Sequence, residues 1–219
     1  MTDSKPKNLS TWIYLGLFAL VSTSLFRKLL LENTTLFFGD FIDFFYGAKK
    51  LSIQLLKEHG LGAWNPYIDG GLPLLADANF AYILYPGNLI FMVTEIAKGF
   101  SLLVIAHHII AALGMYLCSL KHNRNTIASL ASALFFVLSG FYLTSMYRPP
   151  SFYAMSWLPW ICWLWTILEE NPRQGFFYLT LVSVLQVLTG EFQILALSHF
   201  CGLALLLGNT ELKGFSRHS

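Results

Sequence analysis

The hydrophobic and polar positions along this chain form long apolar runs separated by shorter polar stretches. A helix needs ~20 mostly apolar residues to cross the ~30 Å hydrocarbon core of a bilayer. Six runs come near that length: residues 9–26, 101–120, 127–145, 152–168, and the two halves of residues 176–208. The pattern therefore predicts an all-α integral membrane protein with about six transmembrane helices.

The last apolar run is too long to be one transmembrane helix. Its 33 residues, Phe176 to Gly208, would extend ~50 Å as a single helix, well beyond the bilayer core. Gly190-Glu191 is the natural break, because a carboxylate at mid-bilayer costs a few kcal/mol and one at a surface turn costs little. We expect a span on each side of this turn.

Residues 27–100 are the least membrane-like part and are predicted to form a long external loop. Asp40 to His59 carries apolar residues at helical spacing with lysines between them, which predicts an amphipathic helix in the headgroup region. Residues 64–86 contain three prolines and two adjacent glycines, which indicates an ordered but irregular loop. Gly87 to Ala97 is apolar but too short to cross, so we expect a second interfacial helix there. If this segment crossed the membrane as a span, the predicted orientation of every later helix and loop would be reversed.

The positive charges predict that both chain ends are cytoplasmic, because cytoplasmic loops retain Lys and Arg. Arg148 is the one cation of the short external loops, whereas Arg27 and Lys28 fit this orientation poorly. The expected organisation is an N-terminal tail and first helix (1–26), the long loop (27–100), a bundle of about five transmembrane helices (101–208) and a polar tail (209–219). The predicted cytoplasmic cations are Lys5, Lys7, Lys121, Arg124, Arg173, Lys213 and Arg217.

Composition excludes a water-soluble domain. Of 219 residues, 55% are hydrophobic and 12% are charged, about half the charged fraction of soluble domains. The net charge of +2 gives no sign of a nucleic-acid partner. Cys118, Cys162 and Cys201 lie inside apolar runs without CxxC spacing, so we interpret them as packing residues.

The ionisable residues predicted near the external face are the candidates for chemistry. They are Asp40, Asp43, Asp69, Asp77, Arg148 and Glu191, with His199 deeper in the last span. A carboxylate at a membrane surface can act as a general base toward an acceptor hydroxyl. An arginine can bind a phosphate leaving group through two parallel hydrogen bonds.

Each candidate also has a structural interpretation. Asp40 follows Gly39 and could simply cap the helix, while Asp43 could complement the positive end of the same helix. Asp69 precedes two glycines, as turn residues do. Arg148 precedes two prolines and could extend to headgroup phosphates. His107 and His108 are adjacent, so on a helix they point ~100° apart and cannot easily share a metal.

Several segments resemble the YfhO-like bacterial membrane proteins, which belong to the C-type (GT-C) glycosyltransferases. Gly39-Asp40 follows the first apolar run, and WNPYIDGGLPLLADANFAYILYP (residues 64–86) is similar to the first external loop of that family. The stretch ASALFFVLSGFYLTSMYRPPSFYAMSWLP (residues 131–159) and Gly190-Glu191-Phe192-Gln193 also resemble it. The resemblance covers about Leu36 to Leu197 and depends mainly on the order of these motifs.

The resemblance implies an inverting enzyme that moves a sugar from a polyprenyl phosphate carrier to an acceptor outside the cytoplasm. Asp40 occupies the place of the family's catalytic acidic residue; Arg148 would assist the carrier phosphate, and Glu191, Asp77 and His199 would line the same cavity. Some relatives use a divalent cation, which this sequence neither requires nor excludes. Such enzymes usually have more spans, so we expect this chain to be an N-terminal fragment of one, a truncated reading frame, or a part that needs a membrane protein partner.

The sequence thus favours a glycosyltransferase of the bacterial cytoplasmic membrane, with membrane lipid and a polyprenyl-phosphate sugar donor as its partners. The alternative is a non-catalytic membrane module that binds the carrier lipid or scaffolds a partner subunit. A small transporter is disfavoured, because the charged residues lie mostly in loops and not in mid-span.

Overall fold

The structure is a computed structural model that describes residues 8–32, 36, 38–68, 70–77, 82–123 and 125–215. The described chain is mostly helical, as predicted. Its main helices are α1 (Asn8–Leu25), α2 (Arg27–Leu31), α3 (Gly47–His59), α4 (Ile90–Val93), α5 (Ile96–Asn123), α6 (Thr126–Val137), α7 (Gly140–Thr144), α8 (Pro149–Glu170), α9 (Pro172–Val187) and α10 (Phe192–Phe215).

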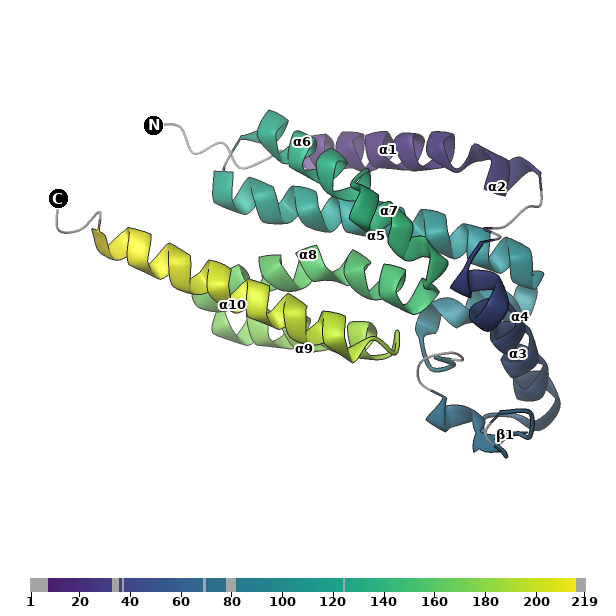
Figure 1. The fold of residues 1–219 in the computed structure, drawn as a ribbon. Helices are drawn as coiled ribbons and strands as arrows, with labels where there is room; N and C mark the ends of the chain where they lie inside the picture. The colour runs from purple at the N-terminus through teal and green to yellow at the C-terminus, as the bar shows by residue number, and fades with distance from the viewer. Residues whose placement is uncertain are drawn as a thin grey trace.

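The long helices run back and forth side by side, with α5 and α8 at the centre (Figure 1). Helix α5 packs against α1, α6 and α8, and α8 packs in turn against α9 and α10. Glycines allow the close approach: a Cβ atom on Gly114 of α5 would lie 2.5 Å from Trp160, and one on Gly202 of α10 would lie 2.2 Å from Trp165. The tryptophans of α8 therefore serve as packing residues between helices.

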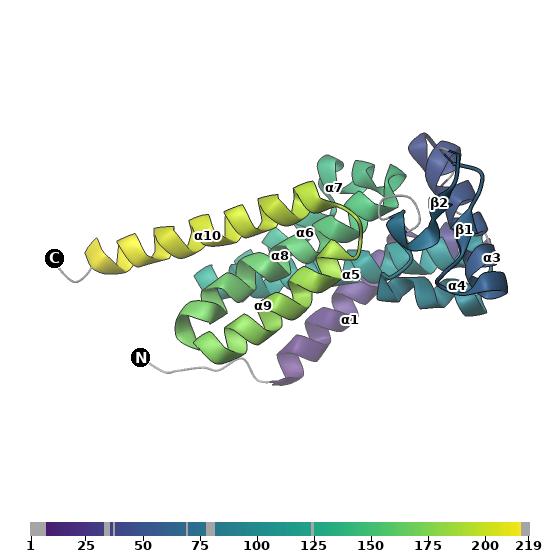
Figure 2. The same ribbon diagram turned by 90° about the horizontal axis from the view of Figure 1, so that it is seen from below.

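The remaining segments form an outer arm, which we define as residues 41–93, at one end of the bundle. It contains the π-helix η1 (Phe41–Tyr46), α3, a two-stranded antiparallel pair of β1 (Trp64–Asn65) and β2 (Leu72–Pro73), the 3-10 turns Leu74–Ala76 and Pro86–Leu89, and α4. The N-terminal end of α1 and the C-terminal end of α10 both lie toward the opposite end (Figures 1 and 2). Phe41 anchors the arm, because its ring packs 4.8 Å from that of Phe100 in α5.

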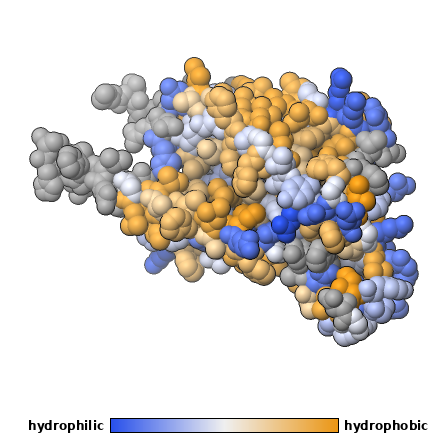
Figure 3. Space-filling view, viewed as in Figure 1, coloured by the Kyte–Doolittle hydropathy of each residue, from blue (hydrophilic) through white to orange (hydrophobic). Residues whose placement is uncertain are grey.

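Two helical stretches of the described chain are long and apolar enough to cross a membrane, Ile96–His122 and Thr126–Tyr147. Gly16–Leu25 and Phe192–Gly208 are shorter apolar helical stretches. Apolar residues cover most of the visible face of the bundle, and large hydrophilic areas lie over the arm (Figure 3). Membrane association fits these features, whereas the six spans stay a prediction because the other described helices fall short of the same criterion.

Several boundaries differ from the predicted ones. The run at residues 127–145 is interrupted between α6 and α7, where Leu138 leaves the helix and Ser139 caps the next one through its side chain. Gly87 to Ala97 is not one interfacial helix: a 3-10 turn and the four-residue α4 end at Thr94, and Ile96 already belongs to α5. At the other end, α10 continues through Phe215 into the segment predicted to be a polar tail. Asp69 lies outside the described residues.

Candidate functional site

The corner between α7 and α8 fixes the position of Arg148. A 3-10 turn (Ser145–Tyr147) follows α7, and Pro149 and Pro150 then start α8. A proline at the first helical position lacks only an N–H that would have no helical partner there, and it forces the preceding residue into an extended conformation. Arg148 accordingly has φ −121° and ψ 90° and projects from the corner without a side-chain cap bond.

The turn between α9 and α10 brings Glu191 to the same corner. Gly190 has φ +88°, a left-handed conformation that glycine adopts without strain. The chain can therefore reverse direction directly before Glu191. One Arg148 nitrogen, Nη2, lies 3.5 Å from Oε1 of Glu191, and the Ser151 hydroxyl donates a 2.8 Å hydrogen bond to the same oxygen.

The geometry of this ion pair leaves part of the guanidinium available. Glu191 is 9% exposed, whereas the Arg148 side chain is 39% exposed. A bidentate arginine–carboxylate pair has two parallel hydrogen bonds of about 2.7–2.9 Å. Arg148 instead meets one oxygen through one nitrogen at a longer distance, so its other N–H groups can bind a further anion. The corner of Arg148, Ser151 and Glu191 is therefore a candidate phosphate site.

Asp40 stands at the start of the outer arm. Gly39 before it has φ +51°, and the π-helix η1 begins directly after it. Single π-helical turns within α-helices are rare and occur often at functional sites. Asp40 makes no side-chain cap hydrogen bond, which contradicts the interpretation that it only caps a helix. Within the described residues its half-buried carboxylate has neither an ion pair nor a hydrogen bond. The η1 segment lies beside the α7–α8 corner in two views (Figures 1 and 2).

Asp77 belongs to a buried cluster inside the arm. Its neighbour is Lys49 of α3, whose side chain is 0% exposed and donates a 3.0 Å hydrogen bond to Asn88 Oδ1. The Lys49 ammonium also lies 3.3 Å from the centre of the Tyr82 ring. Burial lowers the pKa of Lys49 well below its usual value, and the Asp77 carboxylate partly offsets this. The predicted role of Asp77 beside Arg148 is untested.

Tyr82 connects this cluster to the bundle. It has a left-handed φ of +32°, rare for a residue with a side chain, and such strain persists only where surrounding contacts enforce it. Its ring lies edge-on to Tyr153 of α8, with centroids 6.0 Å apart. Tyr82 thus holds the arm against the start of α8, where Tyr153 lies five residues after Arg148.

A chain of hydrogen bonds at the base of the arm has a defined direction. His107 Nδ1 lies 2.8 Å from the Leu103 carbonyl, which can only accept, so Nδ1 carries the proton and Nε2 accepts. Tyr85 then donates to His107 Nε2 at 2.6 Å and accepts from Trp157 Nε1 at 3.2 Å. Burial raises the pKa of Tyr85 to about 12. This series of hydrogen bonds joins the arm, α5 and α8, and each N–H or O–H donor in it already has an acceptor.

The other histidines considered from the sequence hold helices together. His108 contacts Ser22 of α1 at 2.8 Å and the Val137 carbonyl of α6 at 3.2 Å, so it faces away from the partners of His107. His199 accepts from Trp165 at 3.2 Å, and its other nitrogen lies 3.1 Å from Ser183. Both ring nitrogens of His199 are thus engaged within α8, α9 and α10. Its predicted role in the substrate cavity stays a prediction.

Sequence reasoning pointed to Arg148, Glu191 and Asp40, but it missed Lys49, Tyr82 and Ser151. The described residues contain no group of three or more His, Cys, Asp or Glu side chains placed to hold a metal ion. The cysteines are unbonded, and Cys118 and Cys162 are buried. In comparisons with known proteins, no family model, curated protein or solved structure matches the chain.

Proposed function

We propose that the chain is a multi-pass protein of the bacterial cytoplasmic membrane that transfers a sugar from a polyprenyl phosphate carrier to an acceptor outside the cytoplasm. The observation that carries the proposal is the contact between Arg148 and Glu191, which joins two turns far apart in the sequence. A half-exposed guanidinium at this corner is suited to the phosphate of a lipid carrier. The resemblance in motif order supports the same chemistry.

In the proposed reaction, Asp40 acts as general base. It takes the proton from an acceptor hydroxyl while that oxygen bonds to the anomeric carbon of the sugar. The bond from this carbon to the carrier phosphate oxygen breaks on the opposite face, so the configuration inverts. The phosphate leaves with the electron pair, and Arg148 stabilises its developing charge. Glu191 and Ser151 hold the arginine in position.

The free carboxylate of Asp40 is what the base role requires. A carboxylate already engaged in an ion pair or a helix cap would have to give up that contact before it could accept the proton of an acceptor hydroxyl. Asp40 has neither commitment within the described chain. Asp40 directly precedes η1, and η1 lies beside the α7–α8 corner that holds the proposed phosphate site (Figures 1 and 2).

Replacing Asp40 by Asn tests the proposal. Because general-base catalysis contributes typically 10²–10⁴-fold, we expect Asp40→Asn to reduce sugar transfer from a polyprenyl phosphate donor by at least ~100-fold. Transfer would be followed with radiolabelled donor in membranes that contain equal amounts of each variant.

Asp43→Asn is the matched control. Asp43 is an exposed aspartate in the π-helix η1 that follows Asp40, and the substitution makes the same chemical change three residues away. We expect it to retain transfer. Full activity of Asp40→Asn would refute the base assignment. Binding of the carrier lipid without transfer by the wild type would instead favour the alternative, a non-catalytic module that binds the carrier or scaffolds a partner subunit.

A further inference from the structure

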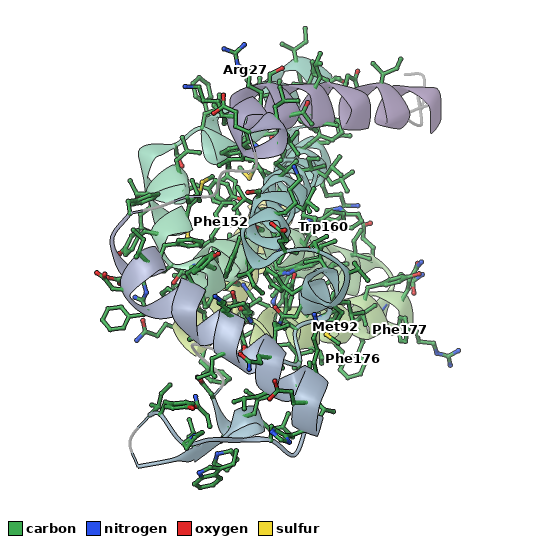
Figure 4. The ribbon with its side chains drawn as sticks, turned by 90° about the vertical axis from the view of Figure 1, so that its right-hand side faces the viewer. Arg27, Met92, Phe152, Trp160, Phe176 and Phe177 are labelled. Carbon is green, nitrogen blue, oxygen red and sulfur yellow. The ribbon has the colours of Figure 1, made fainter. Side chains whose placement is uncertain are left out.

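The strand pair that follows α3 projects to one side of the helical bundle. We define the outer hairpin as residues 60–77, of which residues 60–68 and 70–77 are described. In Figure 1 it lies level with the first turns of α5 and below the bundle. Viewed from the end that carries the arm, its strands lie outside the outline of the bundle helices (Figure 4). The hairpin is therefore beside the bundle and not on top of it.

The level of the outer hairpin matches the surface of a membrane that the bundle crosses. Helix α5 starts the stretch Ile96–His122, which is long and apolar enough to span a bilayer. The start of such a span marks the boundary between headgroups and hydrocarbon. An element that projects to the side of the bundle at this boundary has lipid headgroups beneath it.

The described surface of the outer hairpin is apolar and uncharged. Trp64 and Tyr67 expose 54% and 77% of their surface, and Leu61 and Leu75 are exposed as well. Asp77 is the one charged residue among the described hairpin residues, and it is buried beside Lys49. Neighbouring apolar side chains that remain exposed mark sites of contact with a membrane or another molecule. Tryptophan and tyrosine are the residues that collect at membrane–water interfaces.

The backbone of the outer hairpin holds Trp64 in an outward position. Trp64 pairs with Pro73, which is also exposed, and residues directly opposite in an antiparallel pair share one face. A Cβ atom on Gly71 would lie 2.4 Å from Nε1 of Trp64, so the indole packs on this glycine with one side. Asn65 is buried, and its side chain accepts a 3.0 Å hydrogen bond from the Tyr67 N–H. The exposed rings thus belong to an ordered turn.

We propose that the outer hairpin inserts Trp64 and Tyr67 into the headgroup layer of the membrane beside the bundle. Each ring has an apolar body and one polar N–H or O–H group, which suits a layer between hydrocarbon and water. Because the described hairpin exposes no charge, its contact with lipid does not require anionic headgroups. The inference rests on the proposed membrane-spanning arrangement, but it does not depend on sugar transfer.

The depth of spin labels on the outer hairpin tests this proposal. A single cysteine replaces Leu61 or Leu75 in the full chain without its native cysteines, and its nitroxide is measured by electron paramagnetic resonance in phosphatidylcholine nanodiscs. Oxygen concentrates in hydrocarbon and a nickel chelate in water, so their collision rates report depth. We expect both labels within ~5–10 Å of the boundary between headgroups and hydrocarbon. Leu181, exposed in the middle of α9, and Lys57, exposed on α3, provide the hydrocarbon and water references.

Substitutions of Tyr67 separate insertion from folding. Tyr67→Asp places a carboxylate on the most exposed ring of the hairpin and should return the Leu61 and Leu75 labels to the water value. Tyr67→Phe is the matched control, because it keeps the ring without a charge, and should leave both depths unchanged. An unchanged circular dichroism spectrum checks that Tyr67→Asp still folds. Trp64→Asp should have the same effect as Tyr67→Asp.

The reference labels distinguish the ways in which the proposal can fail. Water-like collision rates at Leu61 and Leu75, with the Leu181 label in hydrocarbon, would overturn this inference and leave the sugar-transfer proposal standing. A Leu181 label in water would overturn both, because the chain would not span the membrane. Insertion only after phosphatidylglycerol is added would also contradict the proposal. Water-like labels that a soluble oligosaccharide shields from the nickel chelate would assign the aromatic surface to carbohydrate instead of lipid.

Discussion

At the scale of single residues, Lys49 is a buried lysine whose surroundings the sequence pattern does not predict. Lys50 and Lys57 lie seven residues apart on one face of α3, whereas Lys49 lies four residues before Ile53, on the buried face. Lys50 and Lys57 are exposed, but Lys49 is buried by Tyr82 and Asn88 of the returning loop. Periodicity within α3 places Lys49 on the buried face but does not identify its cover, which comes from residues more than thirty positions away.

The burial of Lys49 predicts a specific pH dependence. Its folded pKa lies below the ~10.4 of an unfolded lysine, so between the two values the unfolded chain binds one proton more than the folded chain. Stability then increases with pH across this window, by at most ~1.4 kcal/mol per pH unit, and the penalty for burying the lysine is complete below the folded pKa.

Lys49→Met removes this titration. Between pH 8 and pH 10 we expect the melting temperature of the wild type to rise relative to that of Lys49→Met. Lys50→Met, in which the adjacent exposed lysine is replaced, should keep the wild-type pH profile. Melting would be followed by intrinsic tryptophan fluorescence in detergent. Parallel profiles for the wild type and Lys49→Met would mean that the lysine is solvated in the folded protein.

At the scale of elements, the apolar runs predicted which segments are helical, but they predicted the positions of the helix ends less accurately. Hydrophobic length identified α1, α5, α8, α9 and α10 because burial in lipid or in the bundle needs long apolar stretches. The interruption between α6 and α7 was missed, because Leu138 continues the apolar pattern while the Ser139 hydroxyl accepts from the Tyr142 N–H and starts a new helix. Glu191 was predicted at a turn because a carboxylate interrupts an apolar run, and the structure confirms a turn there.

The hairpin of α8 and α9 depends on the absence of a side chain at Gly175. A Cβ atom there would lie 2.4 Å from the Cα of Leu168 and 2.6 Å from its backbone nitrogen. Backbone atoms cannot move aside as a flexible side chain can, so the two helices would have to separate. We expect Gly175→Ala to destabilise the protein by at least the ~1–3 kcal/mol typical of overpacking.

Gly208→Ala provides the comparison, since a Cβ atom on Gly208 of α10 has no neighbour within 4 Å. That substitution should be neutral or slightly stabilising, because alanine favours helices by ~1 kcal/mol over glycine. The two variants would be compared by the fraction folded after graded heating, measured by size exclusion in detergent. Equal stability of the two would show that α8 and α9 do not pack at this close distance.

At the scale of the whole molecule, the site depends on which side of the membrane each turn occupies. In the proposed six-span arrangement the ends of α1 and α10 lie on the cytoplasmic side, and the arm, Arg148 and Glu191 lie outside. The arrangement of the helices fits this alternation, because the arm and the N-terminal start of α1 lie toward opposite ends (Figure 1). This alternation would be reversed after residue 97 if residues 87–97 crossed the membrane.

That segment is too short to cross the bilayer in its folded form. The 3-10 turn Pro86–Leu89 and α4 together contain eight residues before the break at Thr94, and at 1.5–2.0 Å per residue they span at most ~16 Å. A span needs ~30 Å. In the proposed six-span arrangement, residues before and after it then lie on one side of the membrane, and Asp40 lies on the same face as the α9–α10 turn.

Single-cysteine labelling measures this arrangement directly. In a background in which Cys118, Cys162 and Cys201 are replaced by Ala, a cysteine at Lys57, Arg148 or Gln193 should react with a membrane-impermeant maleimide added to intact cells. A cysteine at Lys121 or Arg173 should react only after the membrane is permeabilised. Labelling of the Lys57 and Gln193 positions from opposite sides would separate Asp40 from Glu191 and exclude a shared site. Equal labelling from outside would leave the Asp40 substitution as the remaining test of catalysis.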